Sequence, residues 1–255
     1  MWGDQSAPVA AWMVDAIEPR PGMRVLELAA GTGEVGFTAL PRIEPGGTLI
    51  SSDQSEAMVA VARSRAEQAG LEGIEFRVLD GEWIDLELAS VDAVLCRWGY
   101  MLMADPAAAL RETRRVLRPG GRVALAVWDS REANPWSQVP GEVLVEHGLA
   151  EPPNPQDPGP FKMSDPDVIR TMLADAGFAG LRLDAIDIAR RAPDFDSWWA
   201  THLDLSVATR TAFARADEEQ TLAIEAEIAR RFAPYTAADG SLAVPGRTFV
   251  AAAEA

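Results

Sequence analysis

Val25-Leu-Glu-Leu-Ala-Ala-Gly31-Thr-Gly33-Glu-Val-Gly36 decides the fold, because in this stretch a hydrophobic strand runs straight into a glycine turn and a helix. Glycine lets the backbone approach a ligand closely, and the free N–H groups at the start of a helix favour an anionic group. Gly31, Gly33 and Gly36 spell the pattern G-x-G-x-x-G. On its own this pattern is weak evidence for a ligand, since structural turns often produce it.

Two carboxylates flank the glycine turn and indicate what it binds. Glu27 lies four residues before Gly31, at the carboxyl end of the predicted strand, where it would attract an ammonium group but repel a pyrophosphate. Asp53 ends the next predicted strand, where a carboxylate can accept hydrogen bonds from two ribose hydroxyls. The pair suits a nucleoside that carries an amino acid better than a dinucleotide.

Short β-type runs alternate with helical patterns along the chain, which is typical of a parallel sheet covered by helices. The predicted strands are Arg24–Leu28, Thr48–Asp53, Ile74–Asp80, Val91–Arg97, Arg122–Trp128, Leu181–Ala189 and Arg247–Ala253. We expect a single domain over residues 1–255, with an N-terminal lid helix in residues 1–20. Seven prolines in residues 134–160 predict a mobile connection. Residues 194–233 are predicted to form a helical lid inserted between strands six and seven.

Composition excludes several classes of function. The chain has 39 acidic and 23 basic residues, a net charge of −16, which opposes binding to nucleic acid. No apolar stretch approaches the roughly 20 residues of a membrane span, and the N-terminus lacks the pattern of a secretion signal, so we expect a cytoplasmic protein. The acidic surface is compatible with a monomer or a homodimer. Many arginines and almost no lysine are typical of a bacterial genome rich in GC.

The scarcity of three residue types narrows the chemistry further. A single cysteine, Cys96, excludes an internal disulfide and multi-cysteine metal sites. His147 and His202 lie far apart in the sequence, so we expect no metal site. Lys162 is the sole lysine and follows no catalytic motif, which removes the P-loop, the Schiff base and the Tyr-x-x-x-Lys dyad.

The motifs together resemble a known family, the class I S-adenosylmethionine-dependent methyltransferases, in the branch of the ubiquinone/menaquinone-biosynthesis enzymes. The resemblance covers Met23–Trp136 and is loose elsewhere. It rests on Val25–Gly33, Ser52-Asp-Gln-Ser55, Val91-Asp-Ala-Val-Leu-Cys-Arg97 and Arg115-Val-Leu-Arg-Pro-Gly-Gly-Arg-Val123. It implies an α/β fold with a doubly wound, mostly parallel, Rossmann-like sheet of seven strands in the order 3-2-1-4-5-7-6. The last strand would be antiparallel, and a helical lid would cover the site.

The resemblance also implies a cofactor, S-adenosylmethionine, and a set of binding residues at the strand ends. Glu27, Gly31 and Gly33 would face its methionine part, the backbone of Arg97 would contact its ammonium group, and Asp53 would bind its ribose. Gln54 or Met58 would cover one side of its adenine. Asp80 would accept from the adenine amino group, and the backbone of Gly81 would also contact the adenine. One position departs from the family: its first strand often ends in Asp-x-Gly, whereas this chain has Glu27-Leu28-Ala29. We expect cofactor binding to survive this change.

Aromatic and thioether side chains gather near the predicted strand ends and in the lid, which indicates an acceptor pocket. Its candidates are Trp98, Tyr100, Met101, Trp128, Trp136, Trp198 and Trp199. His202, in the predicted lid, is the candidate general base.

We therefore expect methyl transfer to a small, fairly apolar acceptor, by O- or C-methylation of a phenolic, quinone-like or polyketide-like metabolite in secondary metabolism. A sulfonium methyl group is already reactive, so the protein mainly aligns the acceptor and excludes water. Two alternatives remain at this point: a nicotinamide-dependent oxidoreductase that uses the literal G-x-G-x-x-G, and a non-catalytic cofactor-binding module.

Overall fold

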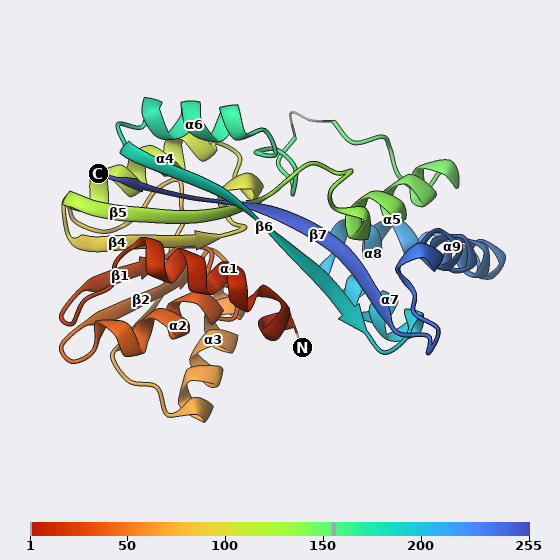
Figure 1. Cartoon of the computed structure of the whole chain (residues 1–255), viewed down its shortest axis with the longest axis horizontal. Helices are drawn as coiled ribbons and strands as arrows, with labels where there is room; N and C mark the ends of the chain where they lie inside the picture. Colours follow the sequence, from red (N-terminus) through yellow and green to blue (C-terminus); the bar gives the residue numbers. More distant parts are fainter. Residues whose placement is uncertain (1, 155–156) are drawn as a thin grey trace. The chain divides into compact units, whose positions relative to one another are not determined.

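The computed structural model describes residues 2–154 and 157–255 (Figure 1). The chain divides into two compact units. The core unit combines Ser6–Asp129, Gln156–Ile186 and Thr248–Ala255. The accessory unit combines Met1–Gln5, Ser130–Pro155 and Asp187–Arg247.

Seven strands form one sheet in the described part of the chain, in the order β3-β2-β1-β4-β5-β7-β6. Strand β1 pairs in parallel with β2 and β4, β2 with β3, and β4 with β5, whereas β7 runs antiparallel to β5. The predicted order and the antiparallel last strand are confirmed. The strands are β1 (Arg24–Glu27), β2 (Thr48–Asp53), β3 (Ile74–Val78), β4 (Val91–Arg97), β5 (Leu117–Trp128), β6 (Ala179–Ala192) and β7 (Leu242–Glu254).

The register of the parallel strands brings their carboxyl ends to one edge of the sheet. Glu27 lies opposite both Ser51 and Leu95, and Asp53 lies opposite Val78. The residues of β1 and β4 are almost all buried, as expected for central strands covered on both faces. Side chains and turns that follow β1, β2, β3 and β4 therefore meet at the same edge, where open α/β sheets bind their ligands.

Helices between the strands of the core unit begin and end at residues that stabilise helix termini. Ser55 accepts from the N–H of Met58 as the N-cap of α3, which ends at Gly70 in the left-handed conformation. Asp105 caps α4 in the same way, with Pro106 in its first turn. The helices of this unit are α2 (Glu34–Ile43), α3 (Glu56–Ala69), α4 (Pro106–Val116), α6 (Pro166–Asp175), most of α1 (Trp2–Ala16), and the short 3-10 helix η1 (Tyr100–Leu102). Figure 1 shows α4 and α6 side by side.

The accessory unit is mainly helical and has a core of its own. Its helices are α5 (Pro135–Glu146), α7 (Phe195–Leu205), α8 (Val207–Phe213), α9 (Glu218–Arg231) and the 3-10 helix η2 (Ala233–Tyr235). Helix α5 packs against α8 and α9, and Ile224, Ile228 and Phe232 are fully buried. Among the described residues, no helix combines the length and the apolar character that a membrane span needs.

Residues 134–160, which the prolines marked as a connection, contain a helix of three turns. Pro135 occupies the first turn of α5, where its missing N–H is not needed, and Pro140 lies within the helix. Proline content alone does not distinguish a helix with a proline start from a linker. Residues 155 and 156 of this range lie outside the described residues.

Candidate functional site

The turn between β1 and α2 contains two glycines in a conformation that other residues rarely adopt. Gly31 and Gly33 have φ angles of +53° and +85°, in the left-handed region that favours glycine. A Cβ atom at Gly33 would also come within 2.5 Å of Cζ of Phe37. Glycine is therefore favoured at both positions, and at position 33 it also makes room for the ring of Phe37.

Asp53 is bonded directly to this turn. Its Oδ2 accepts from the N–H of Gly31 and its Oδ1 from the N–H of Ser55, each at 2.9 Å. A carboxylate offers about four lone-pair sites, so both oxygens retain acceptor capacity. Asp53 thus shapes the turn and presents acceptors to the adjoining cavity.

A cavity of about 410 Å³ opens beside Asp53 in the core unit. Its volume lies within the range of roughly 300–1,000 Å³ that is usual for small-molecule sites. Of the sequence-predicted residues, Asp53, Gln54, Asp80, Gly81 and Trp98 line it. The other lining residues are Ala29, Leu79, Glu82, Gly99, Leu102, Met103, Ala104 and Pro158.

Glu27 lies below the turn with its carboxyl group almost fully buried. Glu27 is 2% exposed, and its Oε2 has no hydrogen-bond partner among the residues that the structure describes. Burial raises the pKa of Glu27 to about 7, against opposing effects of the Gly36 N–H and the charge of Arg97. Glycine at position 36 makes room for this carboxyl, because a Cβ atom there would collide with Oε2. An unpartnered buried acceptor fits a cationic ligand group such as an ammonium.

The side chain of Arg97 is committed to neighbours within the protein. Its Nη2 bonds Oε2 of Glu34 at 2.5 Å, and its Nη1 donates to Oγ of Ser6 at 2.6 Å. The guanidinium also lies 4.8 Å from the ring centroid of Trp98. Arg97 ends β4 and is not among the described residues that line the cavity.

The far end of the cavity is formed by the turn after β3. Asp80 is exposed, and its Oδ1 accepts from the N–H of Glu82 at 2.9 Å. Gly81 packs so closely on Met103 that a Cβ atom would lie 2.5 Å from Cε of that side chain. Met58 is 38% exposed and is not among the described residues that line the cavity, so Gln54 is the better placed of the two adenine candidates.

Trp98 contributes an aromatic wall to the cavity, and two neighbours hold its ring in place. Its ring stacks on Trp128 with centroids 4.2 Å apart, and its Nε1–H donates to Oγ1 of Thr248 at 3.0 Å. Its φ of +57° is unusual for a bulky residue, and strain of this kind occurs mostly at functional sites. Trp98 thus lines the cavity directly, whereas Trp128 is buried behind it.

The remaining pocket candidates lie elsewhere. Tyr100 is fully buried with its hydroxyl on Oγ1 of Thr113 at 2.6 Å, and Met101 is 2% exposed. Both therefore contribute to packing in the core unit. Trp136, Trp198 and Trp199 are buried residues of the accessory unit.

His202 is enclosed by aromatic rings in the accessory unit. It is 3% exposed and stacks on Trp198 and Trp199, with centroid distances of 5.0 and 5.5 Å. Burial, with a contribution from the charge of Arg190, lowers the pKa of His202 to about 3. A histidine in this environment is a weak base, which disfavours the proton-accepting role that the sequence suggested.

The sequence of this chain is similar to those of known methyltransferases. The family described as "Methyltransferase domain" matches residues 19–149, more than half of the chain. The chain is 28% identical over 243 residues to nocamycin O-methyltransferase of Saccharothrix syringae, covering 90% of this chain and 85% of that one.

One further relative supports the same relationship, and one solved structure shares the fold. Ubiquinone/menaquinone biosynthesis C-methyltransferase of Acidiphilium cryptum is 43% identical over 110 residues, 43% of the length of each protein. The crystal structure of the YcgJ protein from Bacillus subtilis has a TM-score of 0.65 at 19% identity, covering 97% of this chain and 98% of that one. At that level of identity, the last comparison shows a shared fold.

Several residues of the site were not predicted from the sequence. Leu79, Glu82 and Leu102 line the cavity because the turns after β3 and β4 fold over it, and no local motif marks such contacts. Glu34 is fixed by Arg97, a pairing between two segments far apart in the sequence. The buried Arg190 was also missed, although the alternation of β6 places it on the same side as Ile188.

Proposed function

Because this chain belongs to the class I S-adenosylmethionine-dependent methyltransferases, we propose that it methylates an oxygen or carbon atom of a phenolic, quinone-like or polyketide-like metabolite. Methyl transfer from S-adenosylmethionine to a small molecule is the established part of this statement. The type of acceptor is the proposal. It is supported by the names of two relatives, one an O-methyltransferase and the other a C-methyltransferase.

We assign the cofactor to the cavity of the core unit. The observation that carries this assignment is the unpartnered Oε2 of Glu27 on one side of the glycine turn, with the acceptor oxygens of Asp53 on the other. When bound, S-adenosylmethionine supplies a methyl group on a positively charged sulfur. Glu27 would accept from its ammonium group and Asp53 from its ribose hydroxyls, and Asp80 with Gln54 and Gly81 would hold the adenine.

The acceptor wall of the core unit would be apolar. Trp98, Leu102 and Met103 line the cavity and offer aromatic, aliphatic and thioether surface. Such a wall can hold a planar, fairly apolar molecule and keep water away from the reacting atoms. Tight alignment of two reactants is itself a large source of rate enhancement.

Proton transfer by His202 is not required by this proposal. Its low pKa makes it a poor base, so an activated carbon, or a hydroxyl that is already ionised, suits the protein better than a weakly acidic alcohol. We expect His202→Gln to change kcat by less than tenfold. A loss of roughly 100-fold or more, the scale of general-base catalysis, would restore His202 as the base.

A transfer assay tests the proposed acceptor class. The protein is incubated with S-adenosylmethionine labelled in its methyl group and with phenols, quinols, β-dicarbonyl compounds and amines, and labelled products are analysed by mass spectrometry. We expect label on oxygen or carbon of the phenolic or dicarbonyl compounds. Label on the amines alone would contradict the acceptor class. Cofactor binding without any labelled product would favour a non-catalytic binding module.

A further inference from the structure

Strand β3 forms one edge of the sheet, and this edge is open. In the described part of the chain, β3 pairs only with β2, and none of its five residues is buried. Helix α3 packs against β3, with the guanidinium carbon of Arg63 5.0 Å from the ring centroid of Phe76. Val78 is 54% exposed. An uncovered strand edge presents main-chain N–H and C=O groups with which another strand can pair.

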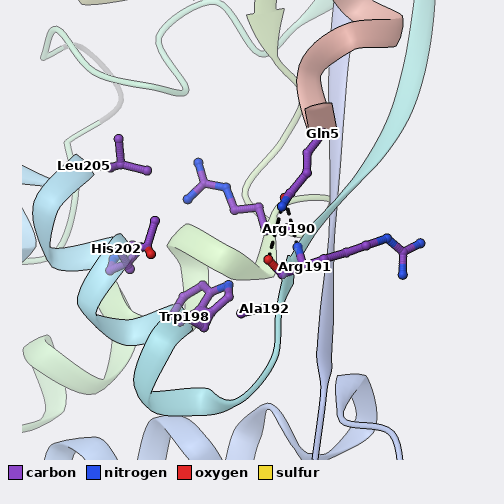
Figure 2. A pocket seen from close by; sticks show the side chains of 8 residues that line it. Gln5, Arg190, Arg191, Ala192, Trp198, His202 and Leu205 are labelled. Carbon is purple, nitrogen blue, oxygen red and sulfur yellow. Dashed lines mark hydrogen bonds between the residues drawn. The ribbon is translucent and has the colours of Figure 1, made fainter. Parts of the chain in front are cut away.

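The opposite edge strand, β6, is protected. The side-chain amide of Gln5 donates to the carbonyl of Arg191 at 3.1 Å and accepts from its N–H at 2.9 Å, as the main chain of a neighbouring strand would. Figure 2 shows both bonds beside a small cavity of the accessory unit at Arg190. In the core unit, Trp12 donates to Oδ2 of Asp184 on the same strand at 3.0 Å. No described side chain bonds the outer main-chain groups of β3, which makes the contrast between the two edges specific.

The directions of the main-chain groups show what the β3 edge offers. The carbonyl of Gly73 accepts from the N–H of Leu49 at 2.9 Å, and the N–H of Leu79 donates to the carbonyl of Asp53 at 3.1 Å. Main-chain groups of successive residues in a strand point to alternate sides, so the odd-numbered residues face β2. The edge therefore carries the N–H and C=O groups of three residues that face away from β2: Ile74, Phe76 and Val78.

The charged residues of β3 select one way of pairing this edge with itself. The side chains of Glu75 and Arg77 are 44% and 41% exposed. In an antiparallel pair centred on Phe76, Glu75 of each copy lies opposite Arg77 of the other. A centre at Glu75 or at Arg77 would instead place like charges opposite each other, which is unfavourable. The register centred on Phe76 also brings outward-facing residues opposite each other, as hydrogen-bonded antiparallel pairs require.

From this self-complementary edge we propose that the chain forms a homodimer, in which the β3 strands of two copies pair antiparallel about a two-fold axis through Phe76. The occupant is a second copy because a two-fold interface needs each residue and its opposite number to match in both directions. Glu75 and Arg77 match by charge, and Ile74 and Val78 match as apolar neighbours. The dimer goes beyond the proposed function, because it does not depend on which molecule receives the methyl group.

Sedimentation velocity over a concentration series tests the dimer on the full chain. Five residues on each side form a small interface, and each copy carries a net charge of −16, so the dimer should be weak. At about 0.15 M salt, charges more than roughly 8 Å apart are largely screened. Under these conditions we expect a dissociation constant of about 10–100 µM, measured from about 1 to 300 µM protein. A chain that stays monomeric over this range would overturn the proposal.

Charge reversal tests the register. Glu75→Arg places arginine opposite arginine, and Arg77→Glu places glutamate opposite glutamate, so each variant alone should dimerise at least tenfold more weakly. An equal mixture of the two variants restores opposite charges across the edge and should form a heterodimer with about the wild-type affinity. A dimer that is insensitive to Glu75→Arg, or a mixture that associates no better than its components, would contradict the proposal.

Two controls separate the interface from general effects. Glu219→Arg, at an exposed position of α9, changes the net charge as Glu75→Arg does and should dimerise like the wild type. Circular dichroism checks folding, which should be retained because the contacts of Glu75 with Arg24 at 3.5 Å and Arg77 at 3.8 Å are exposed pairs of little energetic weight.

If a variant does not fold, hydrogen exchange of the wild-type protein decides. The amides of Phe76 and Val78 should become at least tenfold better protected at high protein concentration than at low concentration. Protection at these amides that does not change with concentration would overturn the proposal. None of these measurements requires methyl transfer, so their outcome is independent of the proposed acceptor.

Discussion

Glu27 shows how one buried residue links sequence, electrostatics and ligand choice. Its carboxyl has lost its hydration without gaining a partner for Oε2, and its pKa is raised to about 7. A cationic ligand group would draw it back to the ionised state, because opposite charges at close range favour the charged form. Cofactor binding should therefore be coupled to release of a proton from Glu27 below neutral pH.

The affinity for S-adenosylhomocysteine should rise between pH 5 and 7 and level off above this pKa of about 7. Where the affinity changes most steeply with pH, it should increase by about tenfold per pH unit, which is the limit when binding releases one proton. Calorimetry in buffers of different ionisation enthalpy measures both the affinity and the released proton. Glu27→Gln should bind more weakly and without this pH dependence. A wild-type affinity that is constant from pH 5 to 7 would disprove the role of Glu27.

Asp53→Ala should weaken S-adenosylhomocysteine binding by about 1.5–3 kcal/mol, the scale for hydrogen bonds to a charged group. Part of the loss should come from the turn, because Asp53 also bonds the N–H groups of Gly31 and Ser55. Asp53→Asn keeps the shape and one acceptor oxygen, so it should recover part of the affinity. Glu56→Ala, an exposed acid at the start of α3, is the control and should bind normally. Unchanged affinity in Asp53→Ala would refute the ribose assignment.

Ala29 occupies the position where the family often has glycine, and the backbone there has φ of +49°. Ala29→Gly should stabilise the protein by about 1 kcal/mol, because alanine is strained in the left-handed region. Ala60→Gly, at an exposed position within α3, should instead cost about 1 kcal/mol. Urea unfolding monitored by circular dichroism measures both changes. A destabilised Ala29→Gly variant would show that the turn carries no such strain.

At the scale of elements, helix α7 should make the accessory unit sensitive to acid. The pKa of His202 is lowered from 6.5 to about 3 in the folded state, so the unfolded chain binds more protons between these values. Stability should therefore fall as the pH drops from 6.5 towards 3. Hydrogen exchange of the α7 amides measures this, and His202→Phe, which keeps the stacking but cannot titrate, should remove the His202 contribution. Protection independent of pH in the wild type would contradict the prediction.

The elements show which parts of the fold could be predicted from sequence. Strand positions follow from local hydrophobic patterns, and they were predicted correctly. The caps of α3 and α4 follow from local chemistry as well. Strand lengths depend on partners: β5 begins at Leu117 and not at Arg122, because pairing with β4 resumes across an irregularity near Val91. Helix α5 was missed because its prolines resemble those of a linker.

The residues of the candidate site also fall into two groups, those that the sheet topology places and those that side-chain packing places. Asp53, Asp80 and Gly81 lie at strand ends, where the topology alone places them at the cavity. By contrast, the burial of Tyr100 beside Thr113 and of His202 against Trp198 and Trp199 results from side-chain packing, which no motif in the sequence marks. The same is true of the cavity at Arg190 in the accessory unit. The cavity thus contains more of the residues predicted for the cofactor than of those predicted for the acceptor.

At the scale of the whole molecule, the net charge of −16 should oppose compaction through self-repulsion. Raising the ionic strength from about 0.01 to 0.1 M shortens the screening length from about 30 to 10 Å, so Tm should increase by a few degrees. Calorimetric scans over a sodium chloride series measure this. A matching series with a neutral osmolyte separates screening from general stabilisation, and a Tm that falls with salt would mean that ion pairs outweigh the repulsion.

The most direct test of the account is a crystal structure of the protein with S-adenosylhomocysteine. We predict the amino group of the ligand within hydrogen-bond distance of the Glu27 carboxyl, its ribose hydroxyls on Asp53, and its adenine between Gln54 and Asp80. A complex in which the nucleoside lies away from the glycine turn, or in which Glu27 stays without a ligand partner, would contradict the central claim.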